Sequence, residues 1–265
     1  MTVIPRKIRR RFVAQLLLSL AIALAAWWAY AAYLESHVPE LAIFAPSPAS
    51  VLHEAMAMMS DGDFWSATLT SNRRVLTGFS ISVILAVPIG LLLGAYPENR
   101  GLAVLGTDFV RYIPVAAVLP LGILWFGIGE SIKLFVLVLG TVFQLIVMVT
   151  DDVRRVPAEM LESALTLGAS RRKAVWTVLL PAAGPALFDS LRVAMSFCWT
   201  YLMMAELVAP MQGLGHLINY SQRFLQIGPI LVVVLFLGLL GLLYDTVFVA
   251  IRGRLFPWVS SVVSR

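Results

Sequence analysis

Residues 157–181 read PAEMLESALTLGASRRKAVWTVLLP and form a polar island between two long apolar runs. Pro157 suits the first turn of a helix, where its missing N–H group costs nothing. Gly168 suits the position just after a helix end, where a positive φ is wanted, and Ser170 can cap a following helix over 171–180. The stretch therefore predicts a short helix that lies across the ends of two membrane spans.

The composition around this island is that of a membrane protein. Of the 265 residues, 60% are hydrophobic and only 13% are charged, whereas a soluble domain carries about 25% charged residues. The mean hydropathy is +0.87. The net charge of +5 comes from short basic clusters at the ends of apolar runs, which is how membrane topology is encoded. We therefore expect membrane lipid, and no nucleic acid, as a partner.

Six apolar runs are long enough, or nearly so, to cross a bilayer, which takes about 20 helical residues. They cover residues 12–34, 75–96, 104–128, 132–150, 186–209 and 229–251. The first run is longer than the apolar core of a signal peptide, about 7–15 residues, so we interpret it as a retained span. Pro181 and Pro185 are expected to mark the start of the fifth span. The prediction is an all-α membrane protein with one domain over 12–265.

Basic residues set the orientation of these spans. With a cytoplasmic N-terminus, 14 of the 20 basic residues fall on the cytoplasmic side and 4 on the other side. Excess Lys and Arg mark cytoplasmic segments. We therefore expect both termini, the basic segment 1–11 and the loop 151–185 to be cytoplasmic, with residues 34–74 outside.

Residues 47–59 resemble an amphipathic helix on the outer side. Ser47 can cap it and Pro48 suits its first turn. Residues 208–226 form a second outer loop. Cys198 is the single cysteine, and the three histidines are far apart in sequence, so neither a disulfide nor a metal site is expected.

The charged face of the island leaves two interpretations open. Glu162 is predicted to share this face with Leu161, Ala164, Leu165 and Leu167. Such a face can dock a soluble partner, or the helix can rest on lipid headgroups as a linker. Anionic headgroups repel acidic residues, and this repulsion disfavours the linker.

The same residues resemble a known motif. Glu162-Ser163-Ala164, Gly168 and Val178-x-Leu180-Pro181 are similar to the EAA loop of ABC-importer permeases, with Ser163 and Val178 as mild departures. Further stretches resemble the nitrate, sulfonate and taurine branch of that family, with Gln144 standing where many relatives carry proline. They are Ser71–Phe79, Pro120–Glu130, Ala205-Glu206-Leu207 and Gly213-Leu214-Gly215.

The resemblance implies a type I ABC-importer permease fold in a bacterial inner membrane, with residues 151–185 carrying a cytoplasmic coupling helix. It implies two cytoplasmic ATP-binding subunits that hold ATP and Mg²⁺, a second copy of this chain and an external solute-binding protein. The chain itself would be no enzyme and would need no cofactor. The docking residues so implied are Glu159, Leu161, Glu162, Ser163, Ala164, Leu165, Gly168 and Pro181.

Five residues are candidates for the substrate pathway: Arg111, Pro114, Pro120, Trp199 and Glu206. Ionisable groups inside spans are functional candidates, and prolines can break a helix so that its backbone faces a pathway.

Each of these candidates also has a structural alternative. Arg111 can reach the interface beside Asp108, three residues away, and Glu206 can pair with Arg223. Trp199 can serve packing alone, and the prolines can serve a packing kink. Arg192, which is not a pathway candidate, is expected to pair with Asp189 or to reach the interface.

Two other function classes compete with the importer permease. A membrane-embedded enzyme needs paired aspartates, Ser/His or HExxH inside the spans, and none occurs. A structural or assembly protein would explain the spans but not the EAA spacing. A small anion such as a sulfonate, taurine, nitrate or bicarbonate is the substrate class that the branch implies.

Overall fold

The computed structural model describes residues 6–96, 101, 109–209 and 211–262, and every element in these ranges is a helix. The helices are α1 Arg6–His37, α2 Pro39–Ala42, α3 Pro48–Ser60, α4 Gly62–Ala95, α6 Phe109–Arg111, α7 Val115–Phe126, α8 Glu130–Arg154, α9 Ala158–Thr166, α10 Arg171–Ala174, the π-helical segment η3 Val175–Leu179, α11 Leu180–Val208, α12 Leu214–Arg223, α13 Ile227–Leu255 and α14 Pro257–Val262.

Five of the described helical stretches are long and apolar enough to cross a membrane. They lie in α1, α4, α8, the continuous stretch Arg171–Val208 and α13. Each covers an expected span to within one residue and extends beyond it on at least one side. Hydropathy underestimates their lengths because the terminal turns are more polar than the lipid-facing middle.

The third expected span, 104–128, is not one long helix. Residues 104–108 lie outside the described residues, and the remainder divides into α6 and the twelve-residue α7. The cause is Pro114, which caps α7 with extended backbone and disfavours helical geometry in the residue before it. Pro120 lies inside α7.

The second span starts thirteen residues earlier than expected, because α4 begins at Gly62. Its first turns carry polar side chains that are buried against other helices, among them Thr68, Ser71 and Arg74. Hydropathy assigns such a segment to the outer loop, although its polar residues face protein. The outer segment 34–74 is therefore partly the start of α4.

The fifth span also starts earlier than expected. Pro181 and Pro185 do not interrupt it, since α10, η3 and α11 follow one another without a break. A proline ring clashes with the carbonyl group four residues before it in a regular helix. The π-helical segment η3 ends two residues before Pro181, and such wider turns are often found at functional sites.

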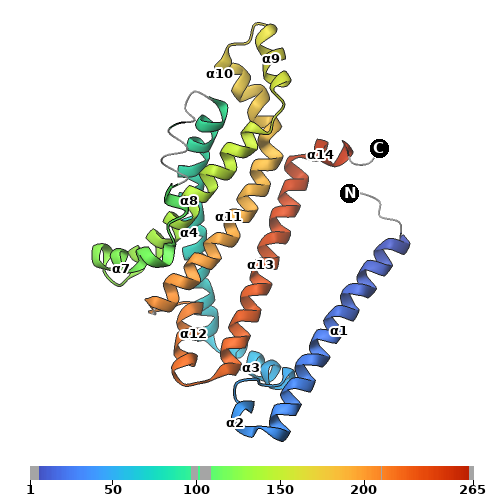
Figure 1. Cartoon of the computed structure of the whole chain (residues 1–265), viewed down its shortest axis with the longest axis vertical. Coiled ribbons are helices and arrows are strands. Elements are labelled where there is room, and N and C mark those ends of the chain that lie inside the picture. Colours follow the sequence, from blue (N-terminus) through green and yellow to red (C-terminus); the bar gives the residue numbers. More distant parts are fainter. Residues whose placement is uncertain (1–5, 97–100, 102–108, 210, 263–265) are drawn as a thin grey trace.

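The core of the molecule is the contact of α8 with α4 on one side and α11 on the other. A buried apolar cluster that includes Ala86, Val149 and Ala183 joins the three helices. Helix α13 packs beside α11, α12 and α3, whereas α1 contacts α2 and α3 and lies apart from the bundle (Figure 1).

The connecting helices gather at the two ends of the bundle. Helix α9 projects beyond the spans at one end, next to α10 at the start of the stretch Arg171–Val208, and α2, α3 and α12 lie at the other end (Figure 1). The expected helix over 47–59 is confirmed as α3, with the Ser47 hydroxyl accepting a hydrogen bond from the Ser50 amide at 3.3 Å. Val51 is its buried residue, while Leu52 and Met56 stay exposed.

Candidate functional site

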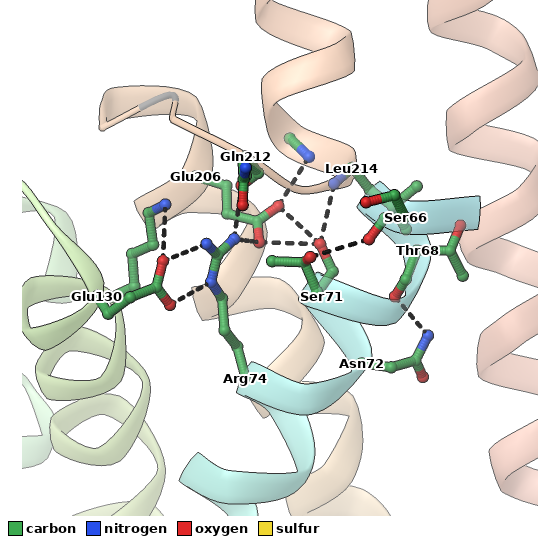
Figure 2. A network of polar contacts seen from close by, with 12 residues as sticks. Ser66, Thr68, Ser71, Asn72, Arg74, Glu130, Glu206, Gln212 and Leu214 are labelled. Atoms are coloured by element: carbon green, nitrogen blue, oxygen red, sulfur yellow. Dashed lines mark hydrogen bonds and ion pairs between the residues drawn. The ribbon is translucent and has the colours of Figure 1, made fainter. Parts of the chain in front are cut away.

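A buried polar network joins four helices at the end of the bundle opposite α9 (Figure 2). Arg74 of α4 is its centre and is only 4% exposed. Its guanidinium donates to both carboxylate oxygens of Glu130 at the start of α8, with 2.7 Å from Nε to Oε2. It also donates to Glu206 of α11 at 2.6 Å and to the Gln212 carbonyl oxygen at 2.5 Å. A buried cation needs such full pairing, because desolvation otherwise costs several kcal/mol.

Glu206 is fully buried and accepts hydrogen bonds from two elements, α4 and the start of α12. Besides Arg74, the Ser71 hydroxyl lies 2.9 and 3.0 Å from its two oxygens, and the Gly215 amide donates to Oε2 at 2.8 Å. The Leu214 amide in turn donates to the Ser71 hydroxyl at 2.9 Å. The network thus fastens the start of α12 to α4 and α11.

The two glycines of Gly213-Leu214-Gly215 are required by this carboxylate. A Cβ atom added at Gly213 would lie 2.4 Å from Glu206 Oε1, and one added at Gly215 would lie 2.5 Å from the Glu206 Cβ. Gly213 also has φ +115°, a conformation that other residues rarely adopt. The backbone approaches Glu206 closely because both positions lack a side chain.

Lys133 completes the charge cluster from one turn further along α8. Its side chain is fully buried, and its Nζ lies 3.8 Å from Glu130 Oε1. Among the described residues, no hydrogen-bond partner is within reach of that ammonium group.

The structural alternative for Glu206 named the wrong partner. Glu206 pairs with Arg74, which is 132 positions away in sequence, and not with Arg223. Glu206 is also too deeply buried to touch a solute-binding protein directly. Arg74 was placed in the outer loop by sequence, so its role was missed. The sequence signal that could have found this role is an arginine close to Ser71 and Gly78, because small residues favour close packing of helices.

The other charged pairs of the spans also differ from expectation. Arg192 donates to both carboxylate oxygens of Asp245 on α13, with 2.6 Å from Nη2 to Oδ2. Asp189, the expected partner of Arg192, instead pairs with Arg252 at 2.8 Å. Two ion pairs therefore bridge α11 and α13, and all four side chains are between a third and a half exposed.

The projecting loop has the local geometry that its sequence predicts. Pro157 is the N-cap of the nine-residue α9, and Gly168 has φ +83° just after its end. The Ser170 side chain accepts a hydrogen bond from the Lys173 amide and so caps α10. Each of these features depends on a few adjacent residues, which is why sequence alone finds them.

One side of α9 faces away from the protein. Of the expected docking residues, Glu159, Glu162, Ser163 and Leu165 are exposed there, whereas Leu161 and Ala164 are half-buried on the inner side. Leu167 is 89% exposed, and Met160, which was not expected, is 45% exposed. Seven residues separate them, so helical spacing places both on one side. Pro181 is exposed but lies in α11, outside α9.

Several contacts tie this loop to the spans. The Ser190 hydroxyl of α11 donates to buried Asp152 near the end of α8. The Arg171 guanidinium lies over the Tyr96 ring at 5.0 Å, next to the end of α4. The Arg154 guanidinium donates to the Leu93 carbonyl oxygen of α4 at 3.3 Å. The residues that flank α9 on both sides are thereby joined to α4, α8 and α11.

A hollow of about 490 Å³ opens between α6, α7, α8 and α11. It is lined mainly by apolar and aromatic side chains, together with Arg111, Gln144 and Tyr201. Arg111 and Pro114 are the two pathway candidates that line it. The expected neighbour of Arg111, Asp108, lies outside the described residues.

The remaining pathway candidates lie elsewhere. Pro120 is within α7 but is not among the lining residues. Trp199 packs between two buried clusters, and the centroid of its ring lies 6.0 Å from that of Tyr244. This is the environment expected of a residue that serves packing alone.

Comparison with known proteins identifies the family of this chain. The model of the family described as "Binding-protein-dependent transport system inner membrane component" matches residues 86–257, more than half of the chain. The chain belongs to this family. It is therefore a membrane-spanning permease subunit of an ABC importer, which decides against the structural or assembly alternative.

Relatives of this permease agree with the branch that the motifs indicate. The taurine transport system permease protein of Escherichia coli (strain K12) is 30% identical over 249 residues, covering 92% of this chain and 89% of that protein. The bicarbonate transport system permease protein of Synechococcus elongatus is 31% identical over 190 residues, covering 71% of this chain and 67% of that protein.

A solved structure supports the fold. The permease resembles a chain of the methionine ABC transporter MetNI in an inward-facing conformation, with a TM-score of 0.62 and 21% identity. The match covers 70% of this chain and 93% of that one. The expected type I ABC-importer permease fold is thereby confirmed.

Proposed function

We propose that this permease imports a small anion, pairs with a second copy of itself and docks through α9 on two ATP-binding subunits. The observation that carries the proposal is α9, a capped helix beyond the ends of α8 and α11 that exposes apolar side chains beside two glutamates.

Docking on a soluble subunit explains the exposed side of α9. Leu167 and Met160 leave apolar surface open to water, which a protein partner would cover. Glu159 and Glu162 are exposed on the same helix and would guide a partner with basic residues around its groove. ATP and Mg²⁺ would be held by that partner, so hydrolysis belongs to the partner and this chain supplies only the coupling.

Pairing with a second copy explains two further surfaces. The described side chains of α1 are almost all exposed, with Ala31 and Leu34 as the buried exceptions. The half-exposed ion pairs between α11 and α13 are also a poor surface for lipid. A second copy related by a two-fold axis along the membrane normal would cover part of both surfaces.

The anionic substrate is supported by the relatives and by Arg111. Sulfonate and bicarbonate groups both present oxygen atoms that share a negative charge, and the hollow beside α7 contains a guanidinium group. A solute-binding protein would deliver the anion at the α12 end, and α9 would face the cytoplasm with both chain termini.

Charge reversal on α9 tests the docking. Glu162→Lys should lower the recovery of a co-expressed ATP-binding subunit about tenfold in pull-downs from solubilised membranes, since a reversed interface charge costs more than about 1.4 kcal/mol. The matched control is Glu40→Lys, the same reversal at an exposed position of α2. It should leave the recovery unchanged. Equal recovery for both variants would show that α9 is only a linker.

A further inference from the structure

Two uncharged polar side chains and one guanidinium group line the hollow between α6, α7, α8 and α11. Gln144 of α8 and Tyr201 of α11 both line it. Within the described residues, neither the Gln144 amide nor the Tyr201 hydroxyl makes a hydrogen bond to another protein group. Arg111 lines the same hollow, and its Nη2 donates to the Tyr112 hydroxyl at 3.1 Å.

Gln144 lies near the middle of the membrane-spanning helix α8. Gln144 is fourteen residues beyond the start of the 25-residue α8, which places it about 21 Å along the helix axis at about 1.5 Å per residue. An unbonded amide facing lipid at this depth costs several kcal/mol. Polar groups at such positions usually face a water-filled cavity or a transport path.

Tyr201 is held in place by a close helix contact. A Cβ atom added at Gly140 of α8 would lie 2.6 Å from the Tyr201 ring, so the ring rests directly on the α8 backbone. Its orientation is therefore set before any ligand arrives, which lowers the entropy that binding would cost.

The rest of the lining is apolar and aromatic. Trp125 and Phe135 meet edge to face with their ring centroids 6.2 Å apart, and Leu139 and Met204 add aliphatic surface. A volume of about 490 Å³ lies within the range of small-molecule sites, about 300–1,000 Å³. Such walls accept a short carbon chain better than a naked inorganic ion.

We propose that this hollow is a binding station on the import path for an organic oxyanion, a sulfonate or carboxylate with a short carbon chain. Arg111 supplies the positive charge, the Gln144 amide and the Tyr201 hydroxyl donate hydrogen bonds to the oxyanion, and the aromatic wall contacts the carbon chain. The inference rests on the proposed function and assigns to that function specific residues of this chain.

The test is uptake by the whole transporter, with its ATP-binding subunits and binding protein, in proteoliposomes. Radiolabelled taurine and ethanesulfonate serve as organic probes, and nitrate and bicarbonate serve as inorganic ones. Gln144→Leu and Tyr201→Phe should each lower uptake at saturating organic probe about tenfold, the usual effect of losing one hydrogen bond to a charged group. The half-saturating concentration should stay constant because the binding protein sets it.

Two further variants separate a path role from a structural one. Tyr244→Phe removes another phenol from the spans, one whose hydroxyl donates to Asn72 at 2.7 Å, and should leave uptake unchanged. Gln144→Glu places a negative charge in the hollow and should abolish uptake of every anion, with normal membrane abundance and ATPase recovery.

Three results of the uptake assay distinguish the binding station from the wider proposal of anion import. Wild-type uptake of the organic probes, together with losses in the Gln144 and Tyr201 variants only, supports the station. Wild-type uptake with unaffected Gln144 and Tyr201 variants overturns the station and leaves the proposed function standing. Absence of uptake of all four probes by the wild type overturns the anion function and the station together.

Discussion

Glu206→Gln exchanges a buried carboxylate for an amide of nearly the same shape, and so tests the network at the α12 end. Both oxygens of Glu206 face donors. Arg74 Nη1 lies 2.6 Å from Oε1, and the Gly215 amide nitrogen lies 2.8 Å from Oε2. Whichever way the amide is turned, its NH₂ group meets a donor and one hydrogen bond becomes a repulsive contact.

The expected loss of stability is large because both charged groups are buried. Glu206 is fully buried and Arg74 is 4% exposed, and removing one partner of a buried ion pair costs about 3–5 kcal/mol. About 2–4 °C of melting temperature is lost per kcal/mol in a domain of 150–250 residues. We therefore expect the apparent Tm of the purified permease in detergent to fall by about 10 °C, compared at one scan rate because unfolding of membrane proteins is often irreversible.

Glu130→Gln is the matched control. It makes the same chemical change to a carboxylate that also binds Arg74, but Glu130 is 60% exposed. The Glu130 side chain is reached by water, and its amide would still offer Arg74 an oxygen acceptor, so the Tm should fall by less than the roughly 10 °C expected for Glu206→Gln. Equal shifts for the two variants, or an unchanged Tm for Glu206→Gln, would refute the reasoning that burial makes this network a main support of the α12 end of the bundle.

Three further outcomes follow from the structure. A cysteine probe at Asp61 should label only from the outside, and one at Ser170 should label only from the cytoplasm. Background labelling should be low because the single native cysteine is buried. Reversed labelling would invert the topology. Arg192→Asp and Asp245→Arg should each lower the Tm, and their combination should restore about 1 kcal/mol; a double variant no better than the sum of the singles would contradict the ion pair. Gly168→Val should strain the backbone at φ +83° by about 1–2 kcal/mol without any steric clash. Membrane abundance should therefore stay normal, while pull-downs should recover less ATP-binding subunit. Full recovery would show that the turn tolerates a side chain.

Local features of the chain were predictable from the sequence. The caps at Ser47 and Ser170 and the positive φ of Gly168 each depend on residues within one helical turn. The apolar runs located five of the spans, because a helix in lipid needs a fixed length of apolar surface whatever its neighbours are. The EAA spacing indicated the family for a related reason, since it describes one compact loop.

The charge partners were not predictable in this way. Periodicity shows neighbours three or four residues apart on one helix, and it suggested Asp189 for Arg192. The structure instead pairs Arg192 with Asp245, 53 positions away, and Glu206 with Arg74, 132 positions away. Such pairs exist only after helices pack, so no window of sequence contains them.

The sequence by itself thus determined the membrane class, the capped loop between α8 and α11 and the family, because these depend on composition and short-range spacing. Only the tertiary structure decided that α4 reaches back to Gly62, that Glu206 is a buried structural anion, and that Arg111, Gln144 and Tyr201 line one hollow. The physical reason is the same in each case. Hydropathy records how polar a residue is, whereas burial and pairing depend on which helix lies against it.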